Sequence, residues 1–321
     1  MHTHIKLSVV VVIRLLALSL FLYLGCTKPA EIEKLKDEKF SIVTTTTQVA
    51  DLARRLTGDN CRVISLMGPG VDPHLYKPTA RDMTAISSAD LVIYHGLKLE
   101  GKLAAILRKA KDLKVYSVCS VIPQGNLLQS KESDVNYPDP HVWFSPSIWI
   151  QCMNGLAKFL AKELPVNETE IFKKAQVIEK EFLDVAAWAK KQFNDLPLNK
   201  RILITSHDAF RYLGDFLGLK VIALQGISTV QEAGLGDRTN LVDYINRNKI
   251  SCLFVESSVN PKALEEIAKE TGISIGKPLF SDALGSVENS SIGPARKSFS
   301  HDTWSGMMAY NVRSIIDGLD P

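Results

Sequence analysis

The sequence predicts an α/β protein in which two βα lobes with mostly parallel sheets are joined by one long, rigid helix. Short apolar runs alternate with amphipathic helical patterns in two separate series along the chain, which is typical of βαβ units. A single uninterrupted helical pattern separates the two series. With 321 residues, of which 45 % are hydrophobic, the chain is long enough to bury the cores of two domains.

The first series predicts an N-terminal lobe over residues 40–166. Apolar runs of four to six residues predict its strands, and stretches with a period of three to four predict its helices. The expected elements, in order, are Phe40–Thr44, Val49–Leu56, Arg62–Met67, Thr79–Ala89, Leu91–Tyr94, Leu103–Ala110 and Val115–Val118.

The linker helix is expected over residues 167–196. Apolar residues recur at steps of three or four from Ile171 to Leu196, which is one face of a single helix. Asn167 is the expected N-cap, acidic residues follow it, and Pro197 comes directly after the last apolar residue. Such a helix is roughly 40 Å long, and as a stiff linker it should permit only modest closure of the lobes.

The second series predicts a C-terminal lobe over residues 197–321. A weak internal repeat supports this division, because SIVTTTTQVADLARRLTG and RILITSHDAFRYLGDFLG both go from a strand through a Thr/Ser-rich turn to a helix and a glycine. The expected elements are Arg201–Thr205, Ala209–Leu217, Val221–Leu224, Leu241–Asn246, Leu253–Glu256 and Ala263–Thr271.

The N-terminus predicts export. Residues 1–26 have the composition of a signal peptide, with Lys6 before a nearly continuous apolar run, and residues 27–39 are expected to form a flexible tether. Leu24-Gly25-Cys26 resembles the end of a lipobox, although Tyr23 stands where leucine is usual. Lipidation of Cys26, ordinary cleavage and an uncleaved anchor stay open. All three place the protein in the periplasm or on the outer face of the inner membrane.

The net charge and the spacing of the cysteines argue against a nucleic-acid-binding protein and against a cysteine zinc cluster. A formal net charge of +3 gives no reason to expect a nucleic-acid partner. The cysteines beyond the signal are scattered, without C-x-x-C spacing, so they do not predict a zinc cluster. A disulfide stays open in an exported protein, but buried thiols are the commoner role in such apolar stretches. These cysteines are Cys61, Cys119, Cys152 and Cys252.

Four residues in separate segments could bind one metal ion: His74 in GPGVDPHLYKPT, His141 in DPHVWFSP, His207 in ITSHDAF and Asp282 in LFSDALG. Three imidazoles and a carboxylate make a compact transition-metal site if the fold brings them together. Taken singly, each histidine is more simply a structural residue, and Asp282 a helix cap. His207 follows its strand directly, and ligands bind beyond the carboxyl ends of strands in open α/β sheets.

Together with ADLVIYHGLKLE and LFVESSVNPK, these segments resemble the motifs of the metal-specific substrate-binding proteins of bacterial ABC importers, the TroA-like or solute-binding family 9. The resemblance covers nearly all of the mature chain. It implies two α/β lobes joined by one long helix, with the metal between them. Matched residue by residue, it implies the ligands His74 and His141 from the first lobe, and His207 and Asp282 from the second.

The resemblance implies a carrier for one zinc, manganese or iron ion, with a membrane permease and a separate ATPase as partners and no organic cofactor. We expect a monomer. The absence of Cys or Met ligands argues against copper(I). The absence of histidine from Gly125–Tyr137 argues against a dedicated high-flux zinc role. Because imidazole must be unprotonated to bind, affinity should fall below about pH 6.

The remaining candidates have other expected roles. His95 is expected beside the ligands or in a structural role, Trp143 in the cleft wall, and His301 at the surface or as a cap. A zinc hydrolase is the enzymatic alternative, although four protein ligands leave little room for an activated water and H-E-x-x-H is absent. A metal-binding surface adhesin is a third interpretation. We expect a binding protein and no enzyme.

Overall fold

The structure is a computed structural model that describes residues 39–110, 112–130, 137–164 and 168–321. Residues 39–321 form one compact unit by their contacts. The predicted signal peptide, Cys26, residues 27–38 of the tether and the expected N-cap Asn167 lie outside the described residues. The domain boundaries at 166 and 197 stay predictions.

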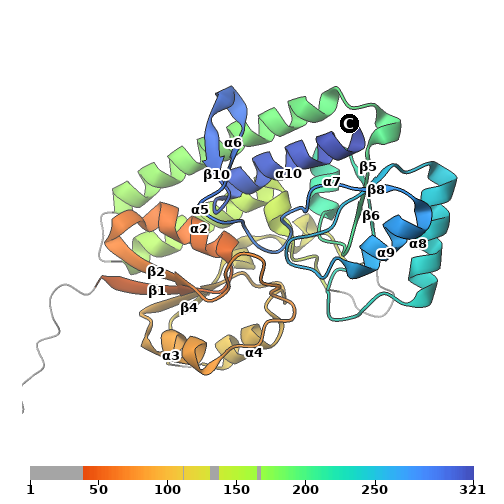
Figure 1. Ribbon diagram of the computed structural model, residues 1–321. Helices are drawn as coiled ribbons and strands as arrows, with labels where there is room; N and C mark the ends of the chain where they lie inside the picture. Colours follow the sequence, from red (N-terminus) through yellow and green to blue (C-terminus); the bar gives the residue numbers. More distant parts are fainter. Residues whose placement is uncertain (1–38, 111, 131–136, 165–167) are drawn as a thin grey trace, which may run out of the picture. The chain divides into compact units, whose positions relative to one another are not determined.

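The N-terminal half is built on a four-stranded parallel sheet in the order β2-β1-β3-β4. Successive side chains of β1 face opposite sides, so Ile42 packs in the core with α2 and α5, while Val43 packs with α3 and α4. Figure 1 shows α3 and α4 below this sheet and α2 above it. The elements are β1 (Phe40–Thr44), α2 (Thr47–Thr57), β2 (Cys61–Ser65), α3 (Ala80–Ser88), β3 (Leu91–Tyr94), α4 (Gly101–Lys109), β4 (Val115–Ser117) and α5 (Pro146–Glu163).

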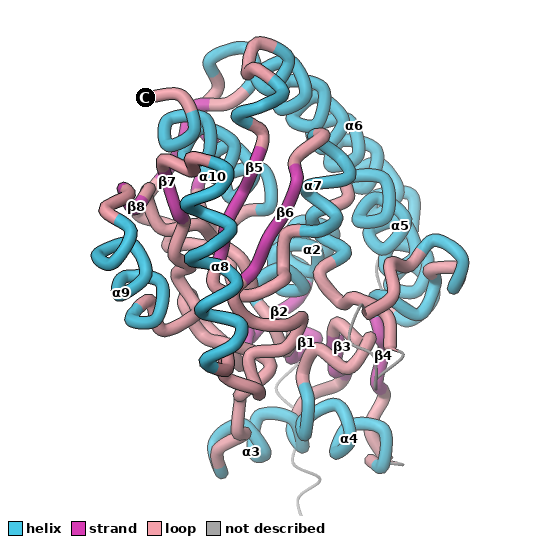
Figure 2. The backbone as a smooth tube through the Cα atoms, turned by 90° about the vertical axis from the view of Figure 1, so that its right-hand side faces the viewer, coloured by secondary structure: helices cyan, strands magenta, loops and turns pink. Residues whose placement is uncertain are grey.

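The C-terminal half repeats this plan. The parallel pairs β5-β6 and β7-β8 are joined by a parallel bridge from Thr205 to Phe254, which gives the order β6-β5-β7-β8. Helices α8 and α9 pack on one face (Figure 2), and α7 and α10 on the other. The elements are β5 (Ile202–Thr205), α7 (Arg211–Leu217), β6 (Lys220–Ala223), α8 (Leu235–Asn248), β7 (Cys252–Leu253), α9 (Lys262–Thr271), β8 (Ser274–Ile275), the antiparallel pair β9 (Ser290–Ile292) and β10 (Ser298–Ser300), and α10 (Trp304–Leu319).

Helix α6 (Glu168–Asn194) is the long helix that the periodic pattern predicts. Its 27 residues correspond to roughly 40 Å at 1.5 Å per residue. All of the apolar positions used for that prediction, from Ile171 to Leu196, are buried. The helix packs against α5 and runs beside α10 (Figure 1), where the rings of Phe182 and Trp304 lie 4.2 Å apart. Both halves of the chain therefore share one face of α6.

Two helices differ from the expectation. Helix α5 was not among the expected elements, although its buried residues recur at steps of three or four: Trp149, Cys152, Met153, Leu156, Ala157 and Leu160. Helix α8 begins at Leu235, six residues before the expected start, where the Gly234 N–H donates to the Asp237 carboxylate. Only Leu241 and Ile245 are buried in α8. The sequence of its first turns therefore shows no apolar periodicity from which a helix could be predicted.

The four cysteines of the described residues are all buried and free, which confirms the expectation of buried thiols. Among the described helices, none combines the length and the apolar character that a membrane span requires.

We predict that Phe182→Ala lowers the free energy of unfolding by about 3–5 kcal/mol, because it empties a fully buried site between α6 and α10. The neighbouring Leu183→Ala is the matched control. Leu183 is 53 % exposed, so its loss should change the free energy by about 0.5 kcal/mol or less. Urea unfolding followed by circular dichroism measures both, and equal losses would contradict the packing of this face.

Candidate metal-binding site

The structure brings the four candidate residues together. One donor atom from each of His74, His141, His207 and Asp282 lies within 4.8 Å of the others. Three of these side chains are fully or almost fully buried, and His74 is partly exposed. His74 follows β2 and His207 follows β5, so both extend from the carboxyl ends of parallel strands, the edge where α/β sheets bind ligands.

The donor atoms face one another, and those of Asp282 and His207 make no hydrogen bond within the part of the chain that the structure describes. His74 Nε2 lies 3.4 Å from His141 Nε2. The two oxygens of Asp282 lie 3.2 Å from His141 Nε2 and His207 Nε2. Neither Asp282 oxygen, nor Nε2 of His207, has a hydrogen-bond partner among the described residues. Buried polar atoms are nearly always paired, so a cluster of unpaired donors suits a cation that would coordinate them.

In two of the imidazoles, the Nδ1 atom lies next to a carboxylate. Asp139 Oδ1 lies 2.8 Å from His141 Nδ1 and accepts the His141 backbone N–H. Glu256 Oε1 accepts the His207 N–H at 2.9 Å, and its Oε2 lies 2.6 Å from His207 Nδ1. Each carboxylate favours a proton on Nδ1, which leaves the Nε2 lone pair directed at the other donors.

These supporting residues were missed from sequence, although a signal was present. The tripeptide Asp-Pro-His occurs twice, and in both copies the aspartate accepts the backbone N–H of the histidine two residues later. Asp72 makes this bond to His74 at 2.8 Å. Glu256 ends the run LFVE, where an acid at a strand end was visible without an assigned role.

The charges around the site favour cations. Burial opposes charge on His141, but Asp139 and Asp282 outweigh it and raise the pKa of His141 to about 9. In the same way, Glu256 and Asp282 overcome burial and raise the pKa of His207 well above its usual value. At His74, burial and the neighbouring imidazoles outweigh Asp282 and lower the pKa to about 3. Although burial opposes it, the neighbouring His207 and His141 hold the pKa of Asp282 well below its usual value.

His95 and Trp143 lie beside the donors. His95 is fully buried, its Nε2 is 2.7 Å from the Pro140 carbonyl, and its ring packs between Trp143 and Trp149. Trp143 Nε1 donates to the carbonyl of Ser281, so the turn that carries His141 is tied to the segment that carries Asp282.

His301 is far from the surface role expected for it. It is 7 % exposed, its Nε2 lies 2.8 Å from Ser291 Oγ, and its ring contacts those of Phe280 and Tyr310. It therefore belongs to the packing between β9, β10 and α10.

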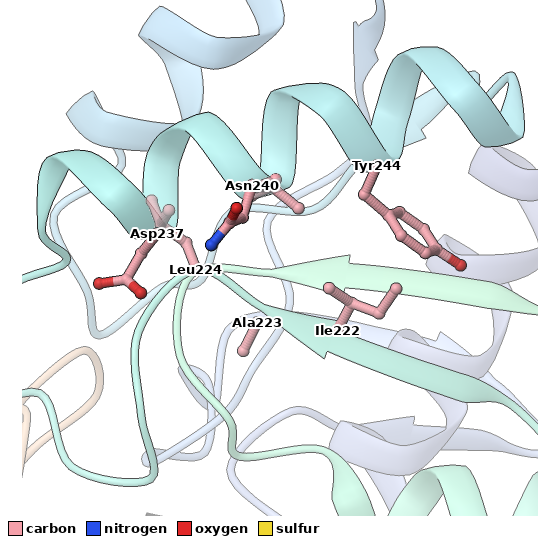
Figure 3. Close-up of a pocket in the computed structure, with 7 residues that line it drawn as sticks. Ile222, Ala223, Leu224, Asp237, Asn240 and Tyr244 are labelled. Carbon is pink, nitrogen blue, oxygen red and sulfur yellow. The ribbon is translucent and has the colours of Figure 1, made fainter.

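Two cavities differ in their relation to these donors. One of about 310 Å³ has His74 in its wall. Another of about 280 Å³ lies between β6 and α8, where Ile222 and Ala223 face Asp237, Asn240 and Tyr244 (Figure 3). This second cavity has no histidine in its wall, and its single carboxylate already caps α8. The first cavity is the one that reaches the candidate site.

The chain is similar to known proteins over most of its length. The family model ZnuA, "Zinc-uptake complex component A periplasmic", matches residues 42–318. The manganese-binding lipoprotein MntA of Bacillus subtilis is 37 % identical over 292 residues, which cover 89 % of this chain and 92 % of MntA. The zinc-binding protein TroA of Treponema pallidum is 34 % identical over 289 residues, covering 88 % of this chain and 90 % of TroA.

The solved structures agree with this likeness. The periplasmic zinc-binding protein TroA from Treponema pallidum superposes with a TM-score of 0.81 at 32 % identity, covering 88 % of this chain and all of that one. Its fold matches the α/β architecture with parallel sheets and a long helix that the sequence predicts. The family model spans almost the whole described chain, and two relatives are more than 30 % identical to it. The chain therefore belongs to the ZnuA/TroA family of metal-binding substrate-binding proteins of ABC transporters.

Proposed function

We propose that this protein captures one transition-metal ion at His74, His141, His207 and Asp282 and delivers it to the permease of an ABC importer. The observation that carries the proposal is the convergence of these four donor atoms within 4.8 Å. Family membership supports the transport role and makes the chain a binding protein rather than an enzyme. The hydrolase interpretation also conflicts with chemistry, because four protein donors leave a tetrahedral ion no open position for water.

The donor set suits zinc, manganese or iron. Neutral imidazole and carboxylate are borderline to hard donors, which these ions share. The names of the relatives do not choose among them, since MntA is named for manganese, TroA for zinc and MtsA of Streptococcus pyogenes for iron. Affinity in such sites follows the general metal series, so the ion carried depends on availability and geometry.

The location and partners follow from the same family. A signal peptide over residues 1–26 would place the protein outside the inner membrane, and lipidation of Cys26 would anchor it there. Four of the similar proteins are named lipoproteins: MntA, ScbA, SloC and MtsA. The partners are a membrane permease and a cytoplasmic ATPase, and the protein would act as a monomer.

The site is tested by counting bound ions. The purified mature chain should hold one equivalent of zinc or manganese by elemental analysis. His141→Ala or Asp282→Ala should weaken binding by more than the roughly 100-fold that loss of a supporting residue costs. His301→Ala is the matched control, because it removes an imidazole outside the site. The proposal would be contradicted if the wild type held no tightly bound metal ion, or if either site variant bound metal as tightly as the wild type.

The carboxylate behind His207 should affect affinity without touching the ion. Glu256→Gln is expected to weaken binding by about 10- to 100-fold, because the amide orients and polarises the imidazole less than a carboxylate does. Glu265→Gln makes the same change on the exposed face of α9 and should leave affinity unchanged. Competition with a chelating dye measures both variants. Equal affinities would show that Glu256 does not support the ligand.

Acidification should weaken binding, since a proton and a metal ion compete for the same nitrogen. Although burial opposes it, the carboxylates beside His141 raise its pKa to about 9 in the ion-free protein. The proton therefore competes already at neutral pH, and more strongly as the pH falls. We expect affinity to drop at least tenfold from about pH 7 to 5 and to rise towards pH 9. A flat competition titration over that range would contradict three-histidine ligation.

A further inference from the structure

A side-chain hydrogen bond joins the turn that carries His74 to the loop after β6. The Thr229 hydroxyl donates to Asp72 Oδ2 at 2.5 Å. Asp72 lies between β2 and α3 in the N-terminal half, and Thr229 lies in the loop after β6 in the C-terminal half. Thr229 is 8 % exposed and Asp72 is half-buried, so this contact is partly shielded from water.

Asp72 uses its two oxygens for two different tasks. Oδ1 accepts the backbone N–H of His74 at 2.8 Å and so fixes the turn of that histidine. Oδ2 receives the Thr229 hydroxyl. One carboxylate thus connects the position of His74 directly with the loop across from it, and a shift of either partner is transmitted to the other.

This bond lies on the open side of the site. Of the four donor residues, only His74 is partly exposed, and it lines the cavity of about 310 Å³. Leu97 and Lys98 contribute to the wall of that cavity from the N-terminal half. Gly226, Ile227, Ser228 and Val230, which flank Thr229 in the sequence, contribute to it from the C-terminal half. An ion that reaches the buried donors, or leaves them, therefore passes His74 between these walls.

The wall at Leu97 and Lys98 is fixed. Both residues have positive φ angles, 52° and 67°, which non-glycine residues adopt only where their surroundings impose them. The buried Glu100 carboxylate supplies this restraint, since it accepts the backbone N–H groups of His95 and Gly96 and the hydroxyl of Thr45. A wall restrained in this way favours widening of the passage from the Thr229 side.

We propose that the Asp72–Thr229 hydrogen bond is a clasp that controls how fast the bound ion leaves. This inference rests on the proposed function. While the clasp is closed, the loop after β6 and the His74 turn are held together and the passage past His74 stays narrow. When it opens, His74 loses a restraint and the two walls can separate. Thr229 is a positioning residue, because it touches none of the four donors' ligand atoms.

The experiment measures dissociation of zinc from the full chain. Zinc-loaded protein is mixed in a stopped-flow instrument with an excess of a chromophoric chelator. Thr229→Val keeps the shape and removes the hydroxyl, and it should release zinc about tenfold faster or more, in line with the loss of a hydrogen bond to a charged group. Thr229→Ser restores a hydroxyl and should rescue slow release. Thr239→Val makes the same change on an exposed turn of α8 and should release zinc at the wild-type rate.

A double variant shows whether the two residues act through one bond. Asp72→Ala should accelerate release further, because it also removes the bond to His74, and adding Thr229→Val to it should change nothing more. Additive accelerations would overturn the clasp. So would wild-type release from a Thr229→Val protein that still holds one ion. Failure of the wild type to hold any zinc, manganese or iron would instead overturn the proposed function.

Discussion

The structure depends on a buried carboxylate, that of Asp282, which is 1 % exposed and lies between two imidazoles. An ionised carboxylate removed from water is costly unless positive charge compensates it. Both of its oxygens lack hydrogen-bond partners among the described residues, so the protein leaves this compensation to protons on the imidazoles or to a bound cation. Asp139 and Glu256, behind His141 and His207, increase the negative charge that a cation would neutralise.

A cluster of close ligand atoms of this kind needs rigid surrounding structure to hold its residues in place. Trp304 of α10 provides part of it: its backbone N–H donates to Asp51 of α2 at 2.9 Å, and its Nε1 donates to the carbonyl of Trp143 at 2.7 Å. Glu181 of α6 accepts from Ser305 and pairs with Arg55. These bonds link the two halves of the chain at a distance from the donors. Consequently the donors approach one another as parts of a preformed frame, and little ordering entropy is left for the ion to overcome.

Local patterns predicted most of the fold, because periodicity reports directly on which face of an element is buried. Helix α5 was missed although its apolar residues recur at helical spacing. The first turns of α8 were missed because they bury almost nothing. The four donors could be named from matching motifs. Their partners could not, since Glu256 is 49 residues from His207 and Thr229 is 157 residues from Asp72, and such contacts exist only once the sheets form. The repeated Asp-Pro-His was a local clue to Asp139, and the acid at the end of the run LFVE was a weaker one to Glu256.

The shared face of α6 has a consequence for the order of folding. One continuous core contains Ile42 of β1, Phe182 of α6, Leu203 of β5 and Met307 of α10. The first half of the chain therefore cannot complete its core until α10, which ends two residues before the C-terminus, has joined it. Contacts of such large sequence separation form late, because loop closure must precede them. A chain built in this way can complete its core only after α10 has been synthesised.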